Sequence, residues 1–298
     1  MREATKGILA MVATCSVWGL SGIYYKLLDH IPPIEILAHR TLWSFIFFAL
    51  VLLAQGRISV LRQTLSARKS VLLIGFAALM ISTNWFVFIT SIQIGKAVEA
   101  SLGYYIFPLV AVLLGAIAFR ERLGKAQLFA VALAATAVIT LTLGLGVPPW
   151  IALILATSFG FYGLVKKGLS VGPVVSVTAE VLLLSPIALG VLWWFHSDGH
   201  GAFGTNWQDS LLLAFSGILT ASPLIMFSYA TKRITLATVG LVQYMNPSLQ
   251  FLVATLLFRE VFSFWHAIAF GMIWSALAIY TTASLRQDRA ARRAILKS

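Results

Sequence analysis

Residues 105–121 read YIFPLVAVLLGAIAFRE, and residues 244–260 read YMNPSLQFLVATLLFRE. Both stretches begin with tyrosine, carry a proline three residues later and end on a glutamate thirteen residues after that proline. Weaker correspondences relate Trp18-Gly19-Leu20 to Tyr162-Gly163-Leu164 and Glu35 to Glu180. The chain therefore repeats itself, and we divide it into two related halves, residues 1–146 and 147–298.

The composition of the chain is too apolar for a soluble fold. Hydrophobic residues make up 59% of the 298 residues and charged residues 11%, whereas globular domains are roughly 45–50% apolar and about 25% charged. This excludes soluble, disordered and nucleic-acid-binding proteins, although the net charge is +12. The single cysteine, Cys15, lies in an apolar run, so no disulfide can form within the chain.

A membrane-spanning helix needs roughly 20 mostly apolar residues, and ten stretches of the chain meet this requirement. They lie near residues 7–28, 35–54, 70–92, 97–119, 126–143, 149–166, 174–195, 209–231, 235–258 and 264–285. The sequence therefore predicts an all-α integral membrane protein with ten transmembrane helices.

The lysines and arginines predict the orientation of these spans, because such residues gather in cytoplasmic loops. Of the 22 lysines and arginines, all except Lys26, Lys96, Arg259 and Arg40 lie on the side of the N-terminus. We expect a multi-pass protein of the cell inner membrane with both termini cytoplasmic. Each half contains five spans, an odd number, so the second half is inverted relative to the first. Inverted repeats are typical of alternating-access transporters, whose substrate site lies near the midplane.

Polar side chains inside the spans are candidate substrate ligands, because polar groups in lipid are costly. Their alternative role is to form hydrogen bonds that only pack helices together. Several of them share helix faces with aromatic rings, which is typical of a wet cavity between the halves. The candidate substrate-binding residues are Trp18, Asn84, Trp85, Ser101, Tyr104, Tyr105, Tyr162, Gln243 and Tyr244.

A second set of residues is suited to coupling or gating, and comprises Glu35, Arg40, Glu99, Pro108, Glu180 and Pro247. A proton-coupled carrier needs a buried carboxylate that can bind a proton, and Glu180 is the first choice. Each proline removes a backbone donor in mid-helix. The freed carbonyls serve as hinges or ligands, or the prolines are simple kinks.

Two other functional classes have to be weighed. Gly19-Leu20-Ser21-Gly22 matches the short G-x-S-G pattern of rhomboid proteases, with His39 and His266 as the available bases. Close helix packing explains so small a pattern better than a protease site does, and we expect no catalytic residue, cofactor or metal. An uncoupled facilitative carrier or channel is the nearer alternative. The expected partners are the lipid bilayer, a neutral, aromatic or cationic small molecule and a second copy of the chain; we expect no nucleic acid.

Strings along nearly the whole chain resemble the RarD type of the EamA family, in the drug/metabolite transporter superfamily. They are Glu35-Ile-Leu-Ala-His-Arg40, Asn84-Trp85, Glu99-Ala-Ser-Leu-Gly-Tyr-Tyr105, Arg120-Glu-Arg-Leu123, Pro149-Trp150, Ser158-Phe-Gly-Phe-Tyr-Gly-Leu164, Pro223-Leu224 and Gln243-Tyr244. One departure is Phe107, where the RarD type usually has asparagine before the proline.

The resemblance implies a carrier of ten helices in which the fifth and tenth lie at the periphery and the others surround a central cavity. Members of this family are mostly exporters or exchangers of small metabolites and drugs. We therefore expect a secondary active transporter or exchanger, working as an exporter.

Overall fold

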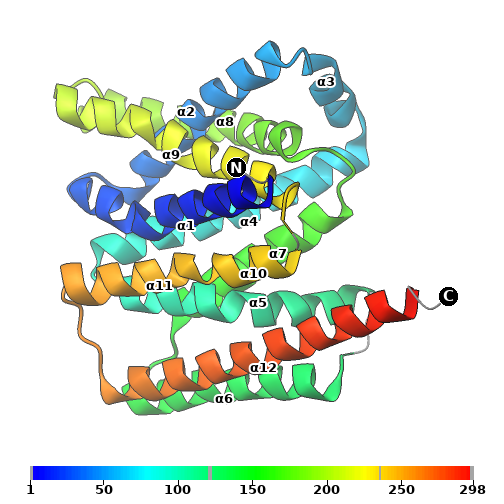
Figure 1. Cartoon of the computed structure of the whole chain (residues 1–298). Coiled ribbons are helices and arrows are strands. Elements are labelled where there is room, and N and C mark those ends of the chain that lie inside the picture. Colours follow the sequence, from blue (N-terminus) through cyan, green and yellow to red (C-terminus); the bar gives the residue numbers. More distant parts are fainter. Residues whose placement is uncertain (1–2, 120–122, 235, 296–298) are drawn as a thin grey trace.

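The computed structural model describes residues 3–119, 123–234 and 236–295, and helices account for most of this part of the chain (Figure 1). The first half contains α1 Glu3–Leu27, α2 Pro33–Ala54, α3 Ile58–Ser66, α4 Arg68–Gln93, α5 Ala97–Phe119 and α6 Lys125–Leu145. The second half contains α7 Trp150–Gly168, α8 Pro173–Ser197, α9 Trp207–Thr231, α10 Leu236–Gln243, α11 Met245–Leu252, the π-helix η1 Val253–Leu257 and α12 Phe264–Ile295.

Local sequence signals account for several helix ends. Proline opens α2 and α8, where its missing N–H costs nothing because the first amides of a helix have no intrahelical partner. The Asn206 side chain caps α9 by accepting a hydrogen bond from the Asp209 amide at 2.7 Å. Gly146 ends α6 in the left-handed conformation, with φ of 72°.

Nine helices of the described residues are long and apolar enough to cross a membrane. The tenth expected span, 235–258, is instead divided into α10, α11 and η1. The break at Tyr244 follows from Pro247, which has no N–H for the Gln243 carbonyl and whose ring crowds that carbonyl. The sequence did not predict α3, a short helix with polar and apolar sides that joins α2 to α4.

The two halves interleave. Helix α2 packs between α8 and α9, α1 packs against α9 and α11, and both α4 and α5 pack against α7. Successive loops alternate between the two ends of the bundle. We call one end the Glu3 end, where α1 begins, and the other the Asp29 end, where the α1–α2 loop lies. Glu121, the repeat partner of Glu260, lies outside the described residues.

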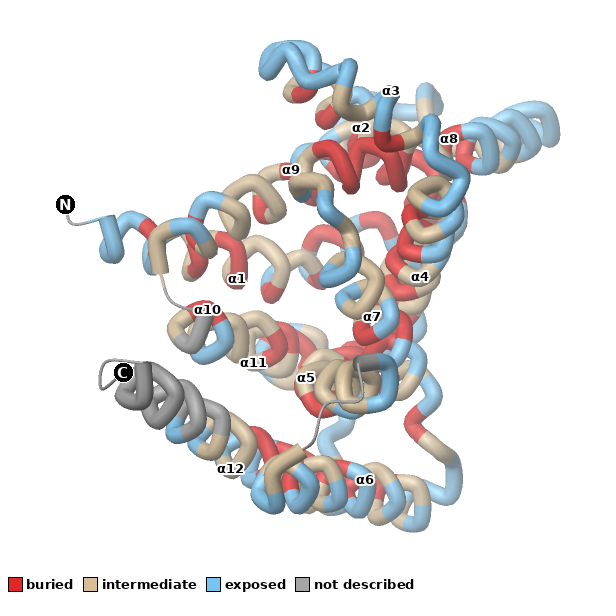
Figure 2. The backbone as a smooth tube through the Cα atoms, turned by 90° about the vertical axis from the view of Figure 1, so that its right-hand side faces the viewer, coloured by how far each residue is buried: buried red, intermediate tan, exposed pale blue. Residues whose placement is uncertain are grey.

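Helices α6 and α12 form a pair at the periphery (Figures 1 and 2). They pack against each other and against α5 through a face that includes Ala130, Ala134, Ala269 and Ile273. The pair corresponds to the fifth and tenth spans, so it occupies the place that the family resemblance implies. Residues Ala267, Gly271 and Ser275 of α12 are exposed.

Candidate functional site

Asn84 joins three helices in the interior of the bundle, and its side chain is 1% exposed. Its Nδ2 donates hydrogen bonds to the Leu155 carbonyl at 3.0 Å and to Ser158 Oγ at 3.1 Å. Its Oδ1 accepts a hydrogen bond from the Tyr104 hydroxyl at 2.8 Å. This Asn84 cluster of Asn84, Tyr104 and Ser158 connects α4, α5 and α7, and it brings together two of the predicted substrate-binding residues.

Aromatic rings continue from the Asn84 cluster in both directions. Towards α1, Tyr104 lies edge-on to Phe88 at 5.8 Å between ring centroids, and Phe88 lies edge-on to Tyr25 at 6.0 Å. Towards α7, Tyr104 lies 6.2 Å from Phe159, which stacks on Tyr162 at 5.9 Å. A continuous series of rings therefore runs between the two halves.

Arg40 lies at the Tyr25 end of this series, and we call Arg40, Tyr25 and Trp85 the Arg40 cluster. Its guanidinium carbon sits 3.9 Å from the centroid of the Trp85 ring, within the range of a cation–π interaction. Its Nη1 donates a hydrogen bond to the Tyr25 hydroxyl. Arg40 is 7% exposed, and no carboxylate of the described residues forms an ion pair with it.

Glu180 lies at the other end of the series and is 2% exposed. One carboxylate oxygen, Oε1, accepts hydrogen bonds from Lys166 Nζ at 2.6 Å and Ser176 Oγ at 3.0 Å. The other, Oε2, accepts a hydrogen bond from the Tyr162 hydroxyl at 3.2 Å. This Glu180 cluster therefore combines a predicted coupling residue, a predicted substrate-binding residue and a lysine that sequence reasoning missed.

Helices α2 and α8 place Arg40 and Glu180 at equivalent positions. Each lies seven residues after the proline that opens its helix, Pro33 or Pro173. Each also lies in a run of seven consecutive buried residues, 35–41 in α2 and 175–181 in α8. Counted from the start of each helix, Glu180 therefore corresponds to Arg40. The alignment of the two halves by sequence had instead matched Glu180 with Glu35.

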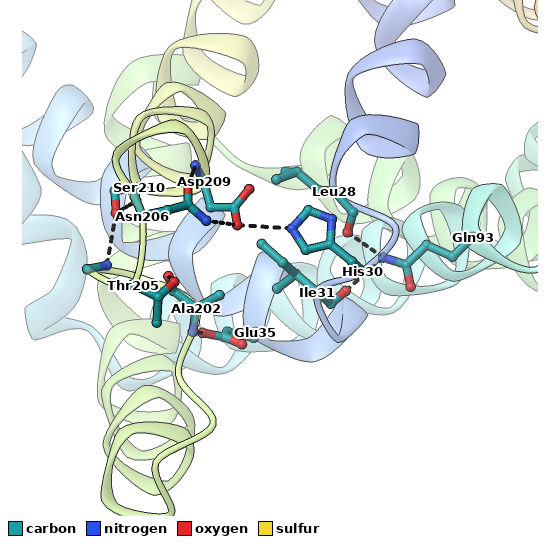
Figure 3. A network of polar contacts seen from close by, with 11 residues as sticks. Leu28, His30, Ile31, Glu35, Gln93, Ala202, Thr205, Asn206, Asp209 and Ser210 are labelled. Atoms are coloured by element: carbon teal, nitrogen blue, oxygen red, sulfur yellow. Dashed lines mark hydrogen bonds and ion pairs between the residues drawn. The ribbon is translucent and has the colours of Figure 1, made fainter.

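Contacts at the Asp29 end connect the two halves. His30 Nε2 lies 3.0 Å from Asp209 Oδ2, between the α1–α2 loop and the start of α9 (Figure 3). Beside it, Gln93 Nε2 donates to the carbonyls of Leu28 and Ile31, which ties the same loop to the end of α4 (Figure 3).

Three glutamates at the Asp29 end accept hydrogen bonds from backbone amides of the opposite half. Glu35 accepts from the Ala202 amide at 2.7 Å (Figure 3), and Glu99 from the Ile151 amide at 3.1 Å. Glu260 accepts from the amides of Ala97 and Val98, each at 2.7 Å. Because the first amides of α5 and α7 lack intrahelical partners, the Glu260 and Glu99 carboxylates cap these two helices favourably. Sequence reasoning singled out Glu260 only as a repeat marker.

Two predicted substrate-binding tyrosines lie against α12. The Tyr105 hydroxyl lies 2.7 Å from Ser248 Oγ, and its ring contacts those of Phe270 and Trp274. The Tyr244 hydroxyl lies 3.4 Å from Thr281 Oγ1 of α12. Both contacts point towards the peripheral pair, whereas Asn84 and Tyr104 face α7.

The remaining predicted residues are distributed over several helices. Trp18 of α1 lies 6.0 Å from Phe227 of α9, ring to ring. Ser101 is fully buried and donates to the Val98 carbonyl of its own helix at 2.8 Å. Pro108 lies within a continuous α5, and Gln243 ends α10 beside the break caused by Pro247. Solute binding by Trp18, Ser101 and Gln243 stays a prediction, and so does a role of Pro108 in coupling or gating.

The Gly19–Gly22 segment has local and packing contacts. The Ser21 hydroxyl donates to the Trp18 carbonyl at 2.7 Å. A Cβ atom at Gly19 would lie 2.6 Å from Leu249 Cβ, so glycine permits close contact between α1 and α11. Of the two candidate bases, His39 stacks on Phe203 and His266 Nδ1 lies 2.8 Å from Ser263 Oγ.

Sequence comparisons agree with this architecture. The EamA-like transporter family matches residues 5–143 and 148–282. An uncharacterized transporter of Vibrio cholerae is 43% identical, over 98% of this chain and 97% of its own length. The uncharacterized transporter YojE of Bacillus subtilis is 40% identical, over 97% and 98% respectively. Protein RarD of Escherichia coli is 35% identical, over the same shares of the two chains.

A solved crystal structure shares the fold, with a TM-score of 0.62 and 19% identity, and the match covers 94% of this chain and 98% of that chain. The names of the relatives point to transporters rather than enzymes. With two family matches that coincide with the two halves of a multi-pass helical membrane protein, the chain belongs to the EamA-like transporter family.

Proposed function

We propose that the protein is a secondary active transporter or exchanger that moves a small organic solute, as an exporter, by alternating access. The observation that carries this proposal is the Asn84 cluster. Its hydrogen bonds join α4 and α5 of the first half to α7 of the second, at a place where the two halves meet. Polar groups in the interior of an inverted repeat are typical of a transporter's binding site.

The proposed cycle requires the contacts at the Asp29 end to break and reform. The His30–Asp209 pair and the Glu260 hydrogen bonds to Ala97 and Val98 each join one half to the other. In the proposed cycle, this end of the bundle is closed while these contacts hold. We propose that both termini face the cytoplasm, in a cell inner membrane, so that the Asp29 end is the external one.

The aromatic series supports a solute with an aromatic or apolar body. Rings of Tyr25, Phe88, Tyr104, Phe159 and Tyr162 follow one another between the halves, and aromatic pairs prefer such offset or edge-on arrangements. The same rings give a solute few fixed charges to pair with.

We also propose that the protein forms a homodimer through the face of α12 that exposes Ala267, Gly271 and Ser275.

Transport by purified protein in liposomes tests the proposal. Proteoliposomes receive a low-molecular-mass metabolite extract, with and without a pH gradient, and mass spectrometry identifies the solutes that accumulate relative to protein-free liposomes. We expect at least one solute whose accumulation depends on the pH gradient or on a counter-solute loaded inside. Accumulation that ignores both would favour the uncoupled carrier, and no accumulation would refute transport.

The hydrolase alternative is tested in the same vesicles with Ser21→Ala. Because the Ser21 hydroxyl donates its hydrogen bond to the Trp18 carbonyl of its own helix, we expect this variant to transport as the wild type does. Loss of transport with retained folding would instead give Ser21 a direct chemical role.

A further inference from the structure

The proposed alternating-access cycle assigns no role to Arg40. It lies seven residues into α2, about 10 Å from the Asp29 end at 1.5 Å per residue. Its side chain is 7% exposed and sits between Tyr25 and Trp85. A guanidinium at this depth keeps its charge, because arginine does not lose its proton in proteins, so the charge needs a partner.

No carboxylate of the described residues forms an ion pair with Arg40. Buried Glu180 pairs with Lys166 at 2.6 Å. Glu35, buried five residues before Arg40 in α2, accepts a hydrogen bond from the Ala202 amide through Oε1, while its Oε2 has no hydrogen-bond partner. Neither oxygen forms an ion pair with Arg40. Glu99 accepts a hydrogen bond from the Ile151 amide. The Tyr25 hydroxyl and the Trp85 ring contact the guanidinium but carry no negative charge. Charged side chains within a membrane protein usually pair with one another or mark a substrate pathway.

The equivalent position in the other half makes the contrast sharper. Glu180, also seven residues into its helix, receives hydrogen bonds from a lysine, a serine and a tyrosine. The fold thus provides hydrogen-bond and ion-pair partners for the buried acid, whereas the buried base has no ion-pair partner among the described residues.

The free side of the guanidinium fits a carboxylate. Nη1 is engaged by Tyr25, and the Trp85 ring covers one face. The buried Nε has no hydrogen-bond partner, and Nε together with the second terminal nitrogen forms an edge that can grip a carboxylate through two parallel hydrogen bonds. Since Nε is shielded from solvent in this conformation, an anion reaches it only when neighbouring helices move, as alternating access requires.

We propose that Arg40 is the anion subsite of the carrier and that its solute is an organic monocarboxylate with an aromatic or apolar body. This inference rests on the proposed transport function and adds the charge of the solute. The body would lie along the rings of Tyr25, Phe88 and Tyr104, which continue from the Arg40 cluster. The sequence analysis expected a neutral, aromatic or cationic solute. The single positive charge of Arg40 can balance one carboxylate, although it could not balance a multiply charged anion.

Ligand-induced thermal stabilisation of the full-length protein in detergent tests the inference without a known substrate. The probes are two matched sets that keep the ring and change the charge: phenylacetate, phenylacetamide and phenethylamine, and indole-3-acetate with its amide and amine. In the wild type we expect each acid to bind about tenfold more tightly than its amide, because the amide leaves the guanidinium charge unbalanced.

Three variants separate recognition from folding. Arg40→Gln is expected to remove the preference for acid over amide. Arg40→Lys keeps the charge but loses the two-pronged grip, so the acid should weaken about threefold or more while the amide is unaffected. Arg62→Gln removes an exposed arginine of α3 and should behave as the wild type. Size-exclusion chromatography establishes folding, and if Arg40→Gln does not fold, the Arg40→Lys comparison decides.

The inference is overturned if no acid binds the wild type better than its amide, if the amines bind best, or if Arg40→Gln retains the acid preference. Its failure is distinct from failure of the proposed function, because binding is measured in detergent and transport in vesicles. Acid-selective binding that depends on Arg40 supports the subsite even where the metabolite screen finds no transport. Gradient-dependent transport without acid preference supports the carrier and refutes the subsite.

Discussion

Replacing Asn84 with alanine tests whether the Asn84 cluster stabilises the contact between the halves. The substitution removes three hydrogen bonds at once, to Tyr104, Ser158 and the Leu155 carbonyl. Hydrogen bonds between membrane helices average about 0.6 kcal/mol each. We therefore expect Asn84→Ala to lower the free energy of unfolding by about 2 kcal/mol. Tyr104→Phe removes one of the three, so its expected cost is about 0.6 kcal/mol.

Reversible unfolding by SDS in mixed micelles, followed by circular dichroism, measures both values. The double variant Asn84→Ala/Tyr104→Phe supplies the internal control, because the shared hydrogen bond can be lost only once. Its cost should therefore fall short of the sum of the single costs by about 0.6 kcal/mol. The reasoning is refuted if Asn84→Ala costs no more than Tyr104→Phe, or if the two costs add fully. Transport by both variants is then compared at equal amounts of folded protein.

Three further contacts are tested by the same unfolding measurement. Lys166→Met leaves the buried Glu180 carboxylate without its cation and should lower the free energy of unfolding by about 3–5 kcal/mol. The double variant Lys166→Met/Glu180→Gln should restore most of this loss, and no recovery would contradict a stabilising ion pair between the two residues. Glu260→Ala exposes two unpaired amides at the start of α5 and should cost about 1–2 kcal/mol, whereas an unchanged stability would show that the cap contributes nothing. A Cβ at Gly103 would lie 2.8 Å from the Ala152 carbonyl oxygen, so Gly103→Ala should cost about 1–3 kcal/mol. The control is Gly163→Ala, where a Cβ would meet no atom within 4 Å, and this substitution should stabilise the protein by up to about 1 kcal/mol. Equal effects of the two substitutions would refute the packing argument.

The overall fold was predictable because lipid makes span length and composition informative. The repeated Tyr-x-x-Pro and Arg-Glu pattern located the two halves, and nine of the ten expected spans appear as long helices among the described residues. The division of the tenth was not predictable. Pro108 and Pro247 each stand three residues after a tyrosine, yet α5 remains continuous across its proline and the later span breaks at Tyr244.

The candidate site was predictable only in part. Helical spacing placed Asn84 and Tyr104 on polar faces, and the structure joins them directly. Spacing cannot tell which neighbouring helix a face meets, so it did not reveal that Tyr105 and Tyr244 contact residues of α11 and α12. Matching like residues paired Glu35 with Glu180, whereas the helix starts pair Glu180 with Arg40. An acid and a base at equivalent positions give no sequence similarity to detect.

Closing the Asp29 end reversibly is the measurement that tests alternating access most directly. Cysteines replace His30 and Asp209, which meet across the halves at 3.0 Å, in a chain whose native Cys15 is changed to alanine. A short bifunctional methanethiosulfonate then bridges the two cysteines, and the His30→Cys single variant controls for modification alone. Transport in proteoliposomes of a solute found in the metabolite screen should fall to the protein-free level when the bridge forms and return when dithiothreitol reduces it. Continued transport at the unbridged rate, with bridging verified by mass spectrometry, would contradict the account.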